Sequence, residues 1–213
     1  MRATIASVYT RLLNALAAYL AQPLKREPSS SSSDPHALAA LLLPGDVPLT
    51  DGNTRIAALV RRVTRSPWSH VAMYVGPLEP GPDPRCIVEA DIAAGVRAVR
   101  LSDLKGLRVR VMRRNGLDDT QRRRLADWVV SRIGGQYDLA HALALARRLL
   151  RLPLASRLAQ APAASATRFI CSTLLAHAFL FVGSPIVPDE SFVTPHDFEA
   201  ASALEPVPMS AGE

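Results

Sequence analysis

The sequence holds few cysteines and few aromatic residues. Two cysteines among 213 residues, Cys86 and Cys171, are too few for a disulfide framework, and a chain of this length can bury a core without one. Both are therefore expected to be free thiols. Phe, Trp and Tyr make up only 5% of the chain, and the abundance of Ala and Leu favours helices over a β-sandwich or barrel. We expect one α+β domain, rich in helices, with appended segments.

Lysine is almost missing as well. Only Lys25 and Lys105 are lysines, so arginine carries nearly all of the positive charge behind the net +6. Arginine pairs well with phosphate, but no stretch interleaves clustered basic residues with aromatics, as proteins that bind single strands do. Nucleic acid is therefore not an expected partner. The chain also has no run of about 18 apolar residues, the length that a membrane-spanning helix requires.

The N-terminus shows an amphipathic pattern instead. Apolar residues such as Ile5, Val8, Leu12 and Leu16 recur at helical spacing, which predicts an N-terminal amphipathic helix within residues 1–24. Such a helix either packs on its own domain or lies on a membrane surface, and both alternatives stay open. No clear cleavage site follows it, so a secretory signal is not indicated. We expect a cytoplasmic or peripherally membrane-associated protein, with secretion left open.

The organisation of the remaining chain follows from its Ser/Pro-rich stretch, its short apolar runs and the residues that end its helices. The Ser/Pro-rich stretch 25–37 predicts a flexible linker, which leaves one folded domain over 38–200 and a C-terminal tail over 201–213. Short apolar runs predict strands after Gly45 and at 70–76, 86–90, 95–101 and 107–112, and their close spacing favours a small antiparallel sheet. A helix is expected from residue 56, with its periodic apolar residues at 56–63 and its end before Pro67. Further helices are expected from the Asp118–Gln121 capping box to Gly134, over 139–152, from Cys171 to Gly183, and after Thr194.

Cys171 and His70 are the residues whose types and positions suggest chemistry. Cys171 begins a predicted helix, whose partial positive charge and free N–H groups lower a thiol pKa from about 8.5 and can stabilise an oxyanion. His70, at the start of a predicted strand, is the candidate base for the thiol proton. Glu89, near the end of the next strand, can orient the ring and stabilise its charged form. If the two strands are antiparallel neighbours, His70 and Glu89 lie close together.

Several short motifs, in a fixed order, resemble those of a known family. They are GDV at 45–47, SPWSHVAMYVG at 66–76, IVEA at 87–90, GVRAVRL at 95–101, GGQYD at 134–138, FICSTLLAHAF at 169–179 and TPHDF at 194–198. Through them, residues 44–198 resemble the circularly permuted papain-fold cysteine hydrolases of the NlpC superfamily, in the YiiX/YebB-like branch, and more distantly lecithin:retinol acyltransferase. The resemblance implies a permuted papain-like α+β fold, with a small antiparallel sheet packed against helices.

The resemblance also implies roles for single residues. Cys171 is the expected nucleophile, His70 the base and Glu89 the third polar member, while Tyr137 and Ser172 are expected at the oxyanion or the substrate. Many family members carry an acidic residue where this sequence has Thr173. The implied reaction is attack of the thiolate on an amide or ester carbonyl, formation of an acyl-enzyme, and acyl transfer to water or another acceptor. No cofactor is implied.

The substrate and two rival interpretations stay open. The superfamily divides between cell-wall peptides and lipid esters or amides, and the fold does not choose between them. The arginine-rich helix expected at 139–158 and the N-terminal helix favour a lipid or acyl substrate approached from a membrane surface. A monomer is expected.

The first rival is a metal site drawn from Cys171, His70, His141, His177 and Glu89. These residues lack the paired short spacing of known metal sites. The second rival is a catalytically idle module that uses the same fold to bind a membrane or a partner.

Overall fold

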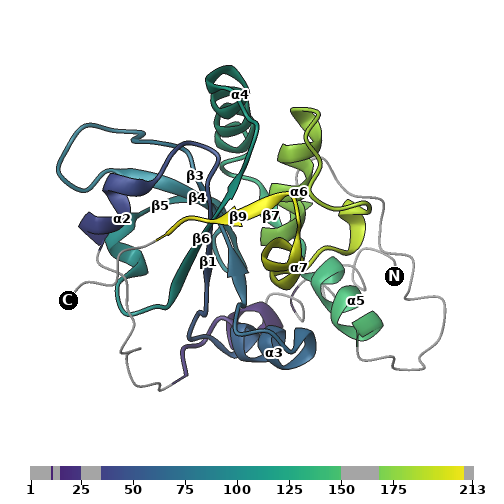
Figure 1. The fold of residues 1–213 in the computed structure, drawn as a ribbon. Coiled ribbons are helices and arrows are strands. Elements are labelled where there is room, and N and C mark those ends of the chain that lie inside the picture. The colour runs from purple at the N-terminus through teal and green to yellow at the C-terminus, as the bar shows by residue number, and fades with distance from the viewer. Residues whose placement is uncertain (1–10, 12–14, 25–34, 150–167, 209–213) are drawn as a thin grey trace.

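Two small antiparallel sheets form the centre of the molecule (Figure 1). The computed structural model describes residues 11, 15–24, 35–149 and 168–208. One sheet has the strand order β2-β1-β6-β9, and the other has the order β3-β4-β5. Their strands are β1 (Val47–Thr50), β2 (His70–Val71), β3 (Met73–Tyr74), β4 (Arg85–Asp91), β5 (Gly95–Arg100), β6 (Val109–Arg114) and β9 (Leu204–Pro206). The α+β class and the antiparallel pairing expected from the sequence are confirmed.

The run predicted as one strand at 70–76 is two strands that serve different sheets. His70 pairs with Thr50 of β1, whereas Met73 pairs with Val88 of β4. Between them, the N–H of Ala72 donates to the carbonyl of Pro48 over 3.1 Å. The backbone therefore stays hydrogen-bonded to β1 where the chain passes from one sheet to the other. His70 therefore lies at the junction of the two sheets.

A third, parallel pair of strands was not expected. Gln136 and Tyr137 of β7 (Gln136–Tyr137) pair with Arg168 and Phe169 of β8 (Arg168–Phe169). Close spacing in sequence favours antiparallel pairing, but β7 and β8 are separated by the long segment that includes α5 (Leu139–Leu149). A parallel pair needs such a crossover connection.

The helices surround the sheets, with α6 and α7 on one side and α2 on the other (Figure 1). Besides α5, they are α2 (Pro35–Leu41), α3 (Arg55–Thr64), α4 (Asp119–Val130), α6 (Cys171–Phe181) and α7 (Pro195–Ala200), with 3-10 turns η1 (Leu101–Leu104) and η3 (Glu190–Phe192). The capping box of α4 forms as predicted, because Gln121 N–H donates to Asp118 Oδ1 and Asp118 N–H to Gln121 Oε1. Two helices end earlier than predicted: α3 before Arg65, which has a left-handed φ of 53°, and α4 before Ser131.

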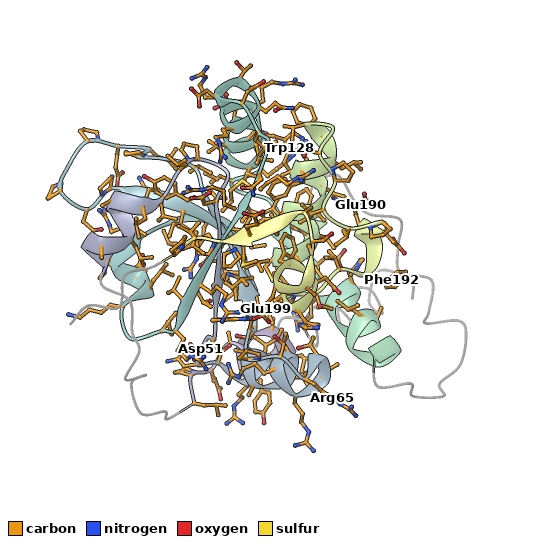
Figure 2. The ribbon with its side chains drawn as sticks, viewed as in Figure 1. Asp51, Arg65, Trp128, Glu190, Phe192 and Glu199 are labelled. Atoms are coloured by element: carbon orange, nitrogen blue, oxygen red, sulfur yellow. The ribbon has the colours of Figure 1, made fainter. Side chains whose placement is uncertain are left out.

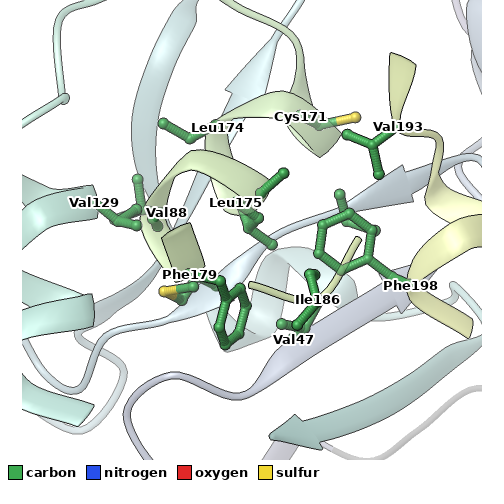
Figure 3. Close-up of a cluster of buried hydrophobic side chains, with 14 of the residues drawn as sticks. Val47, Val88, Val129, Cys171, Leu174, Leu175, Phe179, Ile186, Val193 and Phe198 are labelled. Carbon is green, nitrogen blue, oxygen red and sulfur yellow. The ribbon is translucent and has the colours of Figure 1, made fainter. Parts of the chain in front are cut away.

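The largest core cluster lies where α6 packs against the sheets. Leu174, Leu175 and Phe179 of α6 are fully buried below Cys171, together with Val47 of β1 and Phe198 of α7 (Figure 3). Burial of an aliphatic or aromatic side chain of this size contributes about 1.5–3 kcal/mol, so α6 is held firmly by its packing. Its first residue therefore has a fixed position.

Aromatic packing fixes α6 from a second side. Trp128 of α4 lies against α6 (Figure 2), with its ring centroid 6.0 Å from that of Phe181 and 6.4 Å from that of Phe169 in β8. Edge-on and tilted ring pairs at such distances are favourable beyond the area they bury. Trp128 of α4 thus contacts both β8, which directly precedes Cys171, and the far end of α6, the helix that Cys171 begins.

Two expected segment boundaries differ from the structure. Helix α2 begins at Pro35, inside the stretch predicted as a linker, and β9 lies inside the predicted tail, where it pairs with β6. Of the predicted N-terminal helix, residues 15–20 are helical. Residues 1–10, 12–14, 25–34, 150–158 and 209–213 of the predicted segments lie outside the described residues. No helix in the described part of the chain is long and apolar enough to span a bilayer.

Candidate active site

Cys171 is the first residue of α6, directly after strand β8. Ile170 caps the helix in an extended conformation, and its N–H donates to Thr173 Oγ1 over 3.2 Å. Thr173 therefore caps the helix that carries the cysteine. The backbone N–H groups of Val71 and Ser172 donate hydrogen bonds to the Cys171 sulfur. A thiolate at this position is stabilised by N–H groups and by the positive end of the helix dipole.

His70 contacts both of its predicted partners. Its Nε2 lies 2.8 Å from Glu89 Oε2, and its ring is hydrogen-bonded to the Cys171 side chain. Because Nε2 is taken by the carboxylate, Nδ1 is the ring nitrogen left to exchange a proton with the thiol. The His70 side chain is 25% exposed and that of Glu89 13% exposed. The three residues singled out in the sequence thus meet, and solvent reaches the ring.

The electrostatics of this contact favour a charged pair. Burial raises the pKa of the Cys171 thiol, but the nearby His70 charge, a hydrogen bond from His70 and two backbone N–H groups lower it, and the pKa ends below its usual value. Burial lowers the pKa of His70, while the Cys171 thiolate and Glu89 raise it well above its usual value. The opposite directions favour transfer of the thiol proton to the ring.

Arg97 is a member of the site that sequence reasoning missed. Its Nε donates to Glu89 Oε1 over 3.0 Å and its second guanidinium nitrogen lies 2.9 Å from the same oxygen. Burial raises the pKa of Glu89, but His70 and Arg97 outweigh this effect and bring the pKa down to about 2. Arg97 faces Glu89 directly across the β4–β5 pair. That register was the available signal, because opposite charges on facing strand positions attract.

Tyr137 and Ser172 lie near the sulfur in different ways. Tyr137 is half-buried on β7, and burial, together with the Cys171 charge, raises its pKa well above the usual value, so its hydroxyl stays protonated and can donate. Ser172 is 1% exposed, and its hydroxyl donates to the carbonyl of Val193 over 2.6 Å. The Ser172 side chain therefore anchors the loop before α7, and its backbone N–H is the part that faces the sulfur.

Gly95 positions the β7 segment by a close backbone approach. Val96 N–H donates to the carbonyl of Gly135, and Gly134 N–H donates back to the carbonyl of Val96, each over 2.8 Å. A Cβ atom on Gly95 would lie 2.3 Å from the Gly135 oxygen, and Gly95 has a φ of +73°. Only glycine fits here. The contact holds β7, with Tyr137, beside β5.

A pocket of about 400 Å³ lies over the sulfur. Cys171, His70, Glu89 and Tyr137 line one part of it, and apolar residues of α3 and α5 line another. This volume falls within the range of about 300–1,000 Å³ usual for small-molecule sites. The nucleophile candidate and its base are thus accessible to a substrate.

The histidines considered as metal ligands lie apart from this arrangement. The His141 ring centroid is 6.3 Å from that of Phe192, on η3 beside α5 (Figure 2), and that of His177 is 6.3 Å from that of Phe169. Burial lowers the pKa of His177. Within the described residues, no group of three or more His, Cys, Asp or Glu side chains could hold a metal ion.

Comparisons with known proteins agree with this fold. Residues 43–147 match the model of a family described as permuted papain-like amidases, YaeF/YiiX, C92 family. The matched range includes His70 and Glu89 and ends before Cys171. Among solved structures, metalloprotein YiiX from Escherichia coli O157:H7 is similar, with a TM-score of 0.58 and 16% identity over 80% of this chain and 98% of that one. At this identity the likeness shows the fold alone. No curated protein matches the chain.

Proposed function

We propose that this chain cleaves an amide or ester through a thioester on Cys171. The premise is that it is a permuted papain-like protein of the YiiX-like family, which is a family of cysteine-type amidases and peptidases. Cys171 is the nucleophile, His70 the base and acid, and Glu89 the group that orients the ring. The hydrogen-bonded series Glu89, His70, Cys171 at the start of α6 is the observation that carries this proposal.

The reaction follows from the positions of the protons. The Cys171 thiolate attacks the carbonyl carbon, and the negative charge that develops on the oxygen is stabilised by N–H groups at the start of α6 and by the Tyr137 hydroxyl. The His70 imidazolium donates its proton to the leaving amine or alkoxide as the bond to the carbonyl carbon breaks. Neutral His70 then takes a proton from water, whose oxygen attacks the thioester and releases the acid. The bond between the acyl carbon and sulfur breaks, and Cys171 leaves as a thiolate beside the reprotonated ring, which restores the starting pair.

No step of the proposed reaction is assigned to a metal. The similar Escherichia coli protein is described as a metalloprotein, but the described residues of this chain offer no cluster of three suitable donors. The acidic and imidazole groups nearest to Cys171 are already committed to each other, since Glu89 bonds both His70 and Arg97. All steps are therefore assigned to the chain's own side chains and to water.

The two cysteines provide an internal test. Burial raises the pKa of the Cys86 thiol, whereas that of Cys171 is lowered. Because the thiolate is the reactive form, iodoacetamide near neutral pH should label Cys171 on the order of tenfold faster than Cys86, or more. His70→Ala should remove most of this difference. Labelling of each thiol is followed by mass spectrometry of tryptic peptides, with the urea-unfolded protein as the control in which both react alike.

The rival function is an idle binding module. If Cys171 reacted no faster than Cys86 in the folded protein, and His70→Ala left that rate unchanged, the enzyme proposal would be abandoned in favour of the module. Cys171→Ala, which removes little volume, serves as the control that assigns any esterase or amidase activity to this thiol.

A further inference from the structure

Helix α3 turns its apolar face to the pocket rather than to the core. Ile56, Leu59, Val60 and Val63 follow the spacing i, i+3, i+4, i+7, which places them on one face of the helix. All four are half-buried and line the pocket. Within the described chain, neither core cluster includes a residue of α3, and Ala57 is its single fully buried residue. The apolar face is therefore exposed to whatever fills the pocket.

A second helix completes the apolar half of the pocket. Leu139, Ala142 and Leu145 of α5 line it, and α5 contacts α3. Glu89 and Arg97 of the β4–β5 pair line the pocket outside this apolar half, beside apolar residues such as Val99. Cys171 and His70 line the same pocket. A substrate whose carbonyl lies at the sulfur can thus place an apolar group against the helices.

Hydrogen bonds hold the wall formed by α3 in place. Arg55 of α3 donates to the Tyr19 hydroxyl over 3.0 Å, and its guanidinium lies 4.4 Å from the centre of the Tyr19 ring. Leu24 N–H donates to the carbonyl of Asn53 over 2.7 Å, just before the helix. These contacts fix the start of α3 against residues 19–24, so the apolar face keeps its orientation toward the pocket.

We propose that this apolar half binds the alkyl chain of a fatty acyl group, so that the substrate is an amide or ester of a fatty acid whose acyl carbon is transferred to Cys171. The inference rests on the proposed function and names its substrate class. The wall consists of aliphatic side chains on two helices, whose interior backbone N–H and C=O groups are paired within each helix. A peptide recognised through its backbone needs free main-chain partners such as a strand edge, which this wall lacks. An alkyl chain needs none.

The test is a series of p-nitrophenyl esters: acetate, butyrate, octanoate and dodecanoate. For the wild-type protein, kcat/KM should rise along the series by up to about fourfold for each buried methylene, which is roughly 0.8 kcal/mol converted at 1.36 kcal/mol per factor of ten. Cys171→Ala gives the background rate. Mass spectrometry of the protein after brief exposure to ester should find the matching thioester on Cys171.

Variants of one helix separate the wall from its surroundings. Val60→Glu places a charge in the apolar half and Val60→Trp fills it, so each should lower the octanoate-to-acetate ratio of kcat/KM by roughly tenfold or more. Arg62→Glu introduces the same residue on the exposed side of α3 and should leave the ratio unchanged. If Val60→Glu does not fold, Val60→Trp still decides the outcome.

The possible failures are distinguishable. Thioester formation from acetate, with no rise along the series or with equal ratios in the Val60 and Arg62 variants, would overturn the alkyl-chain site and leave the cysteine mechanism intact. The same holds if an acyl-peptide amide with a short acyl group is cleaved faster than a fatty acyl amide. If no ester of any length acylates Cys171 above the Cys171→Ala background, the proposed function itself fails.

Discussion

Two of the carboxylates that pair with arginine, Asp46 and Glu89, are bound differently. Asp46, just before β1, is fully buried, and Arg113 donates to both of its oxygens, over 2.8 and 2.6 Å. The N–H of Leu43 donates to it as well. Glu89 receives Arg97 on one oxygen only, and gives the other to His70. One carboxylate is thus fully paired with permanent donors, whereas the other shares its charge with a group that can lose its proton.

This difference separates a structural carboxylate from a functional one. Arg113 does not titrate in the usual pH range, so the pair with Asp46 stays the same through any reaction. His70 does titrate, and the strength of its bond to Glu89 changes with its charge. The two sites can be distinguished by experiment, because removal of one carboxylate should affect folding and removal of the other should affect turnover.

The largest expected effect is on turnover, at the Glu89 site. His70→Ala removes the base and should lower kcat/KM for a p-nitrophenyl ester roughly 10²- to 10⁴-fold, the usual range for loss of a general base. Glu89→Gln should cost about tenfold, because an amide can still orient the ring but does not stabilise its positive charge. Both rates are read against Cys171→Ala. Equal losses in the two variants would mean that the Glu89 charge matters more than its orienting role.

The next effect is on folding, at the Asp46 site. Asp46→Asn leaves Arg113 with its charge but without the carboxylate, and should cost about 3 kcal/mol of unfolding free energy, the low end for an opened buried pair. The low end applies since the Arg113 side chain is 23% exposed. Urea unfolding at neutral pH measures the loss.

Two results would contradict this division of roles. Glu79→Gln opens an exposed pair with Arg85 and should change stability little, so an equal loss there would show that burial is not the cause. A loss of Cys171 alkylation rate in folded Asp46→Asn that matches the loss in Glu89→Gln would show that both carboxylates serve the site.

The proximity of His70 and Glu89, and the position of Cys171 at a helix start, could be predicted because they depend on local pattern; the approach of Cys171 to His70 was implied by the family resemblance. His70 lies in the predicted run 70–76, whose later part, β3, pairs with the strand that carries Glu89, and short connections favour such antiparallel pairing. Cys171 could be placed at a helix start because an apolar helical period begins there. These features need no knowledge of distant packing. The geometry of the site agrees with them, while the catalytic roles stay predictions.

What could not be predicted depends on contacts between distant segments. Pairing of β9 with β6 joins residues about ninety positions apart, and no local pattern in a three-residue strand specifies that partner. The split of the run 70–76 follows from two competing partners, β1 and β4. The pattern of α3 predicted a helix, but only its position shows that the apolar face meets a pocket. Arg97 was overlooked because one arginine among many carries no signal until its strand register is known.

Arg97 provides the smallest and most selective test of the comparison. Glu89 has its pKa lowered from 4.5 to about 2 in the folded protein, so its contribution to stability is complete above pH 4.5 and is lost as the pH falls through 2. Arg97→Gln should raise the folded pKa toward 4.5, so that part of this stability is missing at neutral pH. The loss should stay at about 1 kcal/mol or less, as expected of an arginine that is largely solvated, and the gap from wild type should close as the pH approaches 2. Arg100→Gln removes the same charge from the same strand, but Arg100 pairs with the more exposed Glu79, so it should leave the pKa of Glu89 unchanged and its difference from wild type should be smaller than that of Arg97→Gln. Urea unfolding at a series of acid pH values measures all three proteins, and identical curves for the two variants would show that Arg97 does not hold Glu89 in its charged form.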